Sequence, residues 1–173
     1  MLRLLKKLRR FRADECGYSS AEFTIVATTF LTGFFWVFET GLIMTKQMML
    51  ERALDITVRD LRLATSPTYT HDYIKSEICD LALVLKDCST NLYLEMDTFE
   101  PSSGYSKTYK CYDKENDVAP VTSWVPGARS EIVYMRACIV IDPMMPTGIA
   151  LFPGTSSSGV PLVADTAFVN EPE

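Results

Sequence analysis

Histidine is nearly absent from this 173-residue sequence, in which His71 is the single histidine. Imidazole is the commonest general base and metal ligand near neutral pH, so its scarcity argues against most histidine-dependent catalysis. The sequence also lacks a C-x-x-C pair, which disfavours a zinc site, and it lacks a glycine-rich phosphate loop and a G-x-S-x-G nucleophile elbow. These absences predict a protein that is not an enzyme and uses no cofactor.

Positive charge is scarce beyond the first 17 residues. Residues 1–17 contain six basic and two acidic side chains, whereas the rest of the chain contains 11 basic and 20 acidic ones. A nucleic-acid-binding protein needs a basic surface that neutralises phosphates, so the acidic body argues against this class of partner. The composition shows no repeat, low-complexity or disordered signature.

What the sequence has instead is a basic segment followed by a long apolar run. Residues 23–38 carry no charge, Glu39 interrupts the run, and it then continues to Lys46. A helix over residues 23–44 rises roughly 32 Å, about the hydrocarbon thickness of a bilayer. Thr28, Thr29 and Thr32 can return their hydroxyls to the helix backbone, which makes them tolerable in lipid. We therefore predict a transmembrane helix and, from its basic flank, a cytoplasmic N-terminus.

A secretory signal peptide that is cleaved after the run is the alternative. Cleavage requires small residues at positions −3 and −1, but the polar end of the run offers only Glu39, Thr40 and Gly41. Helical periodicity also continues through Lys46, which favours a helix that is retained.

An acidic residue, Glu22, stands at the start of the apolar run, five residues after Gly17. A carboxylate at the beginning of a membrane helix is costly and is a functional hypothesis by default. Cleavage between Gly17 and Tyr18 would create a free amine as its partner. The simpler interpretation is that the charge of Glu22 suits the positive end of the helix dipole.

A basic leader that ends in Gly, with Glu at position five of the mature chain and the aromatic Phe23 after it, resembles a type IV prepilin. The resemblance implies that a prepilin peptidase cuts on the cytoplasmic side and leaves the hydrophobic helix in place. It also implies that Glu22 of an incoming subunit pairs with the N-terminal amine of its neighbour and fixes the axial register of the assembly.

Four segments are similar to the TadE-like minor pseudopilins of the tight-adherence (Flp) pilus system. They are residues 9–23 of the leader, residues 38–41 with a second glutamate before Gly, the continuing helix over 50–62, and the Asn-Glu-Pro finish of 164–172. Two residues depart from the family pattern, Cys16 in place of a common Arg or Lys and Glu173 in place of an apolar end. The related TadF-like proteins share the leader, so this resemblance separates the two types poorly.

The resemblance implies an α+β, pilin-like fold. Its parts would be a cytoplasmic leader (1–17), a transmembrane helix (18–45) and a periplasmic domain with an antiparallel sheet (46–173). The implied function is assembly of a Flp pilus from the bacterial inner membrane, as a single-pass protein. The implied partners are the prepilin peptidase, other Tad pilin and pseudopilin subunits, the inner-membrane assembly platform and lipid. An unprocessed single-span anchor that displays an envelope-binding domain is the alternative function.

Glu39 lies 17 residues beyond Glu22, roughly 25 Å along a helix. We expect it near the outer membrane interface, where a carboxylate reaches water and anchors the helix. A polar contact with the helix of a neighbouring pseudopilin is the second possibility.

Helical periodicity continues beyond Lys46, where apolar residues follow 3/4 spacing and predict one packed helix face, and Ser66–Pro67 ends this helix. These residues are Leu50, Ala53, Leu54, Thr57, Val58, Leu61 and Ala64. A second helix is expected over residues 72–85, capped by Thr70, with Tyr73, Ile74, Ile78, Leu81 and Leu85 facing inward. Strands are expected over residues 91–99, 130–141, 149–152 and 162–169, forming an antiparallel sheet with a turn at 155–159. His71 is placed in an exposed connector, and the acidic stretch 113–117 in a solvated loop, because it lacks the turn glycine of a calcium loop.

Four of the five cysteines lie in the predicted exported body. Cys16 belongs to the leader, whereas Cys79, Cys88, Cys111 and Cys138 form an even set in an oxidising compartment. Three pairings are possible. We favour Cys79–Cys88 with Cys111–Cys138, because the first pair would tie the end of the second helix to the turn that follows it. In the second pair, Cys138 is expected in a strand and Cys111 in a neighbouring one. Zinc ligation by these cysteines is disfavoured for the reasons given above.

Overall fold

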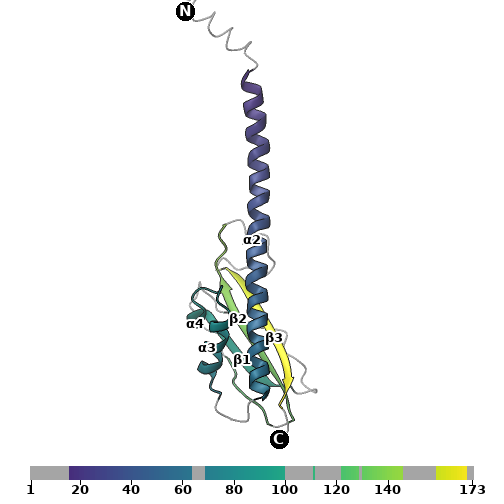
Figure 1. Cartoon of the computed structure of the whole chain (residues 1–173), viewed down its shortest axis with the longest axis vertical. Coiled ribbons are helices and arrows are strands. Elements are labelled where there is room, and N and C mark those ends of the chain that lie inside the picture. Colours follow the sequence, from purple (N-terminus) through teal and green to yellow (C-terminus); the bar gives the residue numbers. More distant parts are fainter. Residues whose placement is uncertain are drawn as a thin grey trace, which may run out of the picture. The chain divides into compact units, whose positions relative to one another are not determined.

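The structure, a computed structural model, describes residues 16–63, 69–99, 111, 122–128, 130–145 and 159–170 (Figure 1). The chain divides into two compact units, Met1–Thr40 and Gly41–Glu173. Helix α2 contributes to both, because the boundary falls inside it. In chain order the elements are α2 (Cys16–Leu63), α3 (His71–Leu81), α4 (Cys88–Asn91), β1 (Leu92–Thr98), β2 (Ile132–Ile141) and β3 (Val160–Val169).

In the first unit, the threonine hydroxyls of α2 donate hydrogen bonds to backbone carbonyls of the same helix. Thr28, Thr29 and Thr32 donate to the carbonyl oxygens four residues earlier at 2.7, 3.0 and 2.8 Å. The expectation that these hydroxyls are satisfied within the helix is therefore confirmed. A hydroxyl bonded in this way needs no water, so threonine does not interrupt the apolar character of the run.

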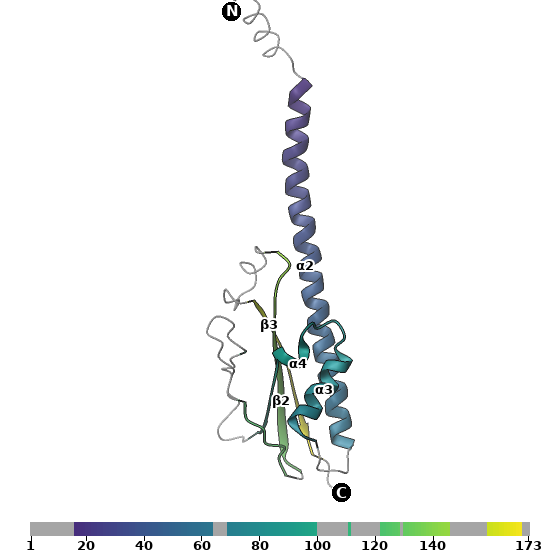
Figure 2. The same ribbon diagram turned by 90° about the vertical axis from the view of Figure 1, so that its left-hand side faces the viewer.

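The second unit contains an antiparallel sheet in the order β1-β2-β3. The strands expected over 91–99, 130–141 and 162–169 correspond to β1, β2 and β3, and the predicted α+β class with an antiparallel sheet is confirmed. Ser130 lies outside β2 because it has a left-handed backbone, with φ at 63°. Helix α3 and the Gly41–Leu63 part of α2 lie on the same face of this sheet (Figure 2).

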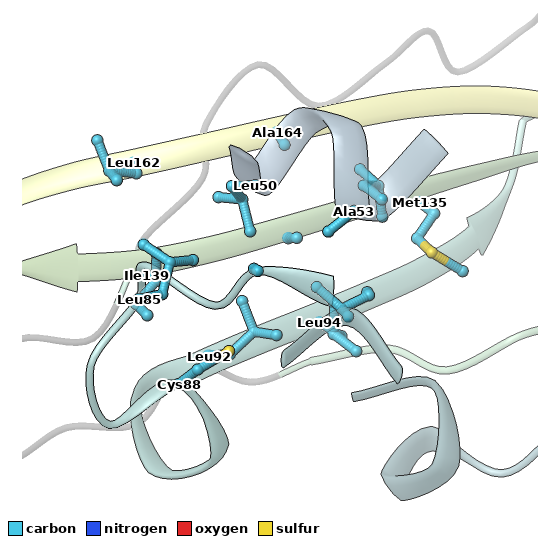
Figure 3. Close-up of a cluster of buried hydrophobic side chains, with 14 of the residues drawn as sticks. Leu50, Ala53, Leu85, Cys88, Leu92, Leu94, Met135, Ile139, Leu162 and Ala164 are labelled. Carbon is cyan, nitrogen blue, oxygen red and sulfur yellow. The ribbon is translucent and has the colours of Figure 1, made fainter. Parts of the chain in front are cut away.

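The core lies between that face and the helices. Leu50, Ala53, Leu54 and Val58 of α2 are buried, as the 3/4 spacing predicted, and they join the sheet residues in one hydrophobic cluster. In Figure 3, Leu50 and Ala53 are drawn between Leu162 and Ala164 of β3 and the residues of β1. On the strands, alternate residues supply this core because side chains of a strand point to opposite faces in turn. They are Leu92, Leu94 and Met96 of β1, Val133, Met135, Ala137, Ile139 and Ile141 of β2, and Val160, Leu162, Ala164 and Phe168 of β3.

The second helix is shorter than predicted. Thr70 caps α3, its hydroxyl accepting from the backbone N–H of Tyr73 at 3.4 Å, but the helix ends at Leu81 and not at residue 85. Only Ile74 and Ile78 of its residues are buried, while Tyr73 and Leu81 are exposed, so their predicted inward orientation was wrong. The chain turns after Ala82, and Leu85 reaches the core from the connection and not from the helix.

His71 also differs from expectation. It is the first residue of α3, and its ring is half-buried, edge-on to Trp124 with 5.0 Å between ring centroids. Predictions for several other segments fall outside the described residues. These are the leader up to residue 15, the helix end at Ser66–Pro67, the acidic stretch 113–117, the strand at 149–152, and most of the turn at 155–159.

Candidate functional site

The proposed cleavage site lies at the very start of α2. The helix begins at Cys16, so Gly17 and Tyr18 belong to its first turn. The proposed scissile bond therefore lies within α2, ahead of the apolar run over residues 23–38.

Glu22 follows Tyr18 by four residues and is exposed. Residues four apart lie on the same side of a helix, about 6 Å along its axis, so an amine at Tyr18 would face the same direction as this carboxylate. The Phe23 side chain beside it is 73% exposed. The start of α2 thus presents a carboxylate and an aromatic ring together on its surface.

Over residues 23–38, the large apolar side chains of α2 are exposed on every side of the helix. Among the described residues, one helix is long and apolar enough to cross a membrane, over Ser19–Arg62. Such a helix near the N-terminus fits a single-pass membrane protein. The exposed apolar side chains are Phe23, Ile25, Val26, Phe30, Leu31, Phe34, Phe35, Trp36, Val37 and Phe38.

Two glycines interrupt this bulky surface. A Cβ added at Gly33 or at Gly41 would meet no atom within 4 Å. Small residues on a membrane helix let a second helix approach closely. Gly33 and Gly41 therefore mark two positions where another helix could pack against α2.

Glu39 is the buried acid of this helix. It is 5% exposed, whereas the preceding Phe38 is well exposed. Glu39 also takes part in a polar or electrostatic interaction within the chain. Its two proposed roles, interfacial anchor and contact with a neighbouring helix, remain predictions.

The four cysteines of the body form two disulfides, Cys79–Cys88 and Cys111–Cys138, which is the pairing favoured above. Their Cα atoms are 5.6 and 5.8 Å apart, distances typical of disulfides. Cys79–Cys88 links α3 to α4. Cys138 lies in β2, and Cys111 itself is not part of a strand, contrary to the expectation that it lies in a neighbouring one.

The sheet has a polar row that the sequence did not reveal. On the face away from the helices, Arg136 stands opposite Glu95 on one side and Asp165 on the other. Arg136 is 5% exposed, and its guanidinium lies 3.4 Å from the Glu95 carboxylate. Its Nε donates to the Tyr134 hydroxyl at 3.0 Å. Burial, with a smaller effect of the Asp165 carboxylate, raises the pKa of Tyr134 above its usual value.

This row stabilises the sheet, since Arg136 faces an opposite charge across each of its two strand pairs and donates to the Tyr134 hydroxyl along β2. The only sequence signal for it was the alternation of Tyr134, Arg136 and Cys138 in a strand that is otherwise apolar. Which acids face Arg136 depends on strand register, and a single sequence does not specify register.

The comparisons with known proteins assign no family to this chain. No family model matches it, and no curated protein or solved structure is significantly similar to it. Its function is therefore inferred from its own residues and from their arrangement.

Proposed function

We propose that this chain is a TadE-like minor pseudopilin of a tight-adherence (Flp) pilus, matured by a prepilin peptidase that cuts between Gly17 and Tyr18. The observation that carries the proposal is the exposed Glu22, five residues after Gly17 and directly before residues 23–38, whose large apolar side chains are exposed on every side of the helix. In a plain membrane anchor a carboxylate near lipid is costly, and Glu22 lies at least six residues into α2, beyond the first turn in which a negative charge gains from the helix dipole.

The role of Glu22 is to pair with a free N-terminal amine. Cleavage makes Tyr18 the first residue of the mature chain and gives it a positively charged N-terminal amine. In an assembly, this amine would lie at the same depth in the membrane as the Glu22 carboxylate of a neighbouring subunit. At an intermediate dielectric, two such charges at contact distance attract each other by a few kcal/mol. Pairing would compensate both charges in lipid and set the axial register between subunits.

The rest of the molecule agrees with this role. The apolar side chains of α2 and the open surfaces at Gly33 and Gly41 suit packing among membrane helices. A small α+β unit with two disulfides suits an oxidising compartment outside the cytoplasm. In this proposal the unit is pilin-like and periplasmic, and the partners are the prepilin peptidase, other Tad pilin and pseudopilin subunits, and the inner-membrane assembly platform.

Processing is tested by intact mass and N-terminal sequencing of the protein extracted from its native membrane. We expect a mature chain that starts at Tyr18. Gly17→Leu should block the cut, because a bulky residue then occupies the position before the scissile bond, whereas Gly33→Leu on the same helix should leave it unchanged. A native protein that retains residues 1–17 would favour the unprocessed single-span anchor, and a start near residues 40–42 would indicate a cleaved signal peptide.

Assembly is tested separately with Glu22→Ala. We expect this variant to be cleaved largely as the wild type is, but to give no pili, as counted by electron microscopy of cells that lack the native copy. Glu51→Ala, which removes an exposed acid of the same helix outside the apolar run, is the matched control and should assemble. Normal piliation with Glu22→Ala would exclude the pairing role of Glu22.

A further inference from the structure

Gly41, the first residue of the unit Gly41–Glu173, marks one end of this unit, and hydrogen bonds and strand register identify the other segments at the same end. Gln47 Nε2 donates to the Val163 carbonyl at 2.7 Å, near the start of β3. Leu50 and Ala53 follow the same direction as Leu162 and Ala164, so α2 and β3 run alike (Figure 3). The start of β3 therefore lies at the end of the unit that contains Gly41.

The remaining strands place two further segments at this end. In the register, Ile141 at the end of β2 pairs with Val160, and Leu92 at the start of β1 pairs with Ile139. The chain just after β2 and the connection between α3 and β1 must therefore lie at the Gly41 end as well. In Figure 3, Leu85 and Cys88 of that connection lie on the Leu92 and Ile139 side of the core.

Among the residues that the structure describes, the apolar side chains named below are more exposed at this end than those at the opposite end. Leu83 is 88% exposed, Met144 76%, Met48 69% and Met44 61%, with Val84 beside Leu83 at 41%. We call these five residues the Gly41 rim. At the opposite end Val169, Val125, Ile132 and Phe99 are exposed to between 38% and 44%. Single exposed apolar residues are normal on a protein surface, but a group at one end indicates a contact.

The exposure of Leu83 and Val84 is fixed by the fold. Ala82 and Leu85, on either side of them, are buried, and the Leu85 N–H donates to the Ala82 carbonyl at 3.0 Å. The Cys79–Cys88 disulfide closes this connection. Because both flanks are held in the core, the two apolar side chains between them cannot fold inward, and they stay on the surface.

We propose that the Gly41 rim inserts into the headgroup layer of the bilayer that α2 crosses. The inference rests on the proposed membrane function. If residues 23–44 span the hydrocarbon, Met44 lies at its edge and Met48 about 6 Å beyond, within the layer of about 5–10 Å in which amphipathic surfaces insert.

The test uses the full chain in phosphatidylethanolamine–phosphatidylglycerol vesicles whose acyl chains carry bromine close to the headgroup, which quenches tryptophan on contact. Trp36→Phe removes the tryptophan of the apolar run and leaves only Trp124 as background. On this background Leu83→Trp places a probe on the Gly41 rim, and Val169→Trp places the same probe at the opposite end. Both sites are exposed, so neither substitution disturbs the core.

We expect the Leu83→Trp probe to lose most of its emission in brominated vesicles and the Val169→Trp probe to lose none. Met48→Trp, a second rim position, should behave as Leu83→Trp does. An unquenched, water-exposed Leu83→Trp probe would overturn the inference. A blue-shifted but unquenched probe would overturn it too, because the rim would then be covered by another protein subunit.

Comparison of the wild-type protein with Trp36→Phe shows whether rim insertion alone is wrong or whether the proposed membrane span is wrong too. The emission lost on Trp36→Phe reports Trp36, which must be quenched in matched vesicles brominated near the middle of the acyl chains if α2 crosses the bilayer. If Trp36 is quenched but the Leu83→Trp probe is not, insertion of the Gly41 rim is excluded, whereas the membrane span is supported. If neither is quenched, both the proposed membrane span and the rim are wrong.

Discussion

Helix α2 contains two regions with opposite relations to their surroundings. Over residues 23–38 the helix is apolar on all sides, and almost all of its large side chains are exposed. Over residues 50–58 it is apolar on one side only, and that side is buried against the sheet. Uniform hydrophobicity is typical of a helix that could cross a membrane, whereas 3.6-residue periodicity is typical of one that packs against its own domain.

The largest contrast should come from the same substitution made in the two regions. Leu50→Ala, at a fully buried residue, should lower the free energy of unfolding of the second unit by about 2–5 kcal/mol, through lost burial and a new cavity. Leu31→Ala, on the same helix but half exposed, should leave this free energy unchanged. Urea titration in detergent, followed by Trp124 fluorescence in the Trp36→Phe background, measures both. Equal losses would show that the two regions unfold as one.

The disulfides should also distinguish the two regions of α2, since both disulfides lie in the second unit and neither contacts residues 23–38 by a covalent bond. In the chain-entropy account, loops of about 10 and 28 residues give roughly 2.7 kcal/mol for Cys79–Cys88 and 3.6 kcal/mol for Cys111–Cys138. We therefore expect Cys111→Ser with Cys138→Ser to destabilise the unit more than Cys79→Ser with Cys88→Ser. Neither double variant should alter helicity over residues 23–38. The same urea titration, with circular dichroism for helicity, checks the order, and a reversed order would contradict the loop-length argument.

Alkaline pH should also act on the second unit. The folded state raises the pKa of Tyr134, chiefly through burial and then through Asp165, so the folded protein keeps this phenol protonated where the unfolded chain, with its pKa near 10, does not. The contribution is therefore fully present below pH 10 and is lost as pH rises above it. Tyr134→Phe removes this titration, so the stability difference between wild type and variant should shrink above pH 10. A difference that is constant from pH 8 to 11 would refute the linkage.

The smallest effect should come from the threonines, whose chemistry is alike in both regions. Thr32 and the buried Thr57 each donate to the carbonyl four residues earlier, at 2.8 and 2.9 Å. Valine keeps the shape and leaves that carbonyl bonded within the helix. Thr32→Val and Thr57→Val should each change stability by less than about 0.5 kcal/mol. A large loss for Thr57→Val alone would reveal a further partner of its hydroxyl.

The sequence predicted the elements with a strong period best. The apolar face of Leu50, Ala53, Leu54 and Val58 and the alternation in the three strands were recognisable because each period has one geometric cause. The predicted end of α3 at residue 85 was wrong because Leu81 and Leu85 continue the helical spacing of apolar residues in the sequence. The chain turns at Ala82, where the Cys79–Cys88 disulfide brings it back.

The candidate site divides in the same way. Glu22, Gly17 and the exposed run 23–38 depend on order along one helix, and a single sequence reveals them. The row of Glu95, Arg136 and Asp165 depends on which strand residues face each other. The exposure of Leu83 likewise depends on its neighbours Ala82 and Leu85 being held in the core. Neither follows from local pattern.

By itself, the amino-acid sequence determined where the helix is apolar throughout, where it becomes amphipathic, and which segments alternate as strands. These features follow from hydrophobic periodicity, which is local. Only the tertiary structure decided that α3 ends at Leu81, that Arg136 lies between two acids, and that Leu83 and Met144 come to the end of the unit where Gly41 lies. Those features depend on strand register and on contacts between distant residues, and both are set when the whole chain minimises its exposed apolar surface and satisfies its buried charges.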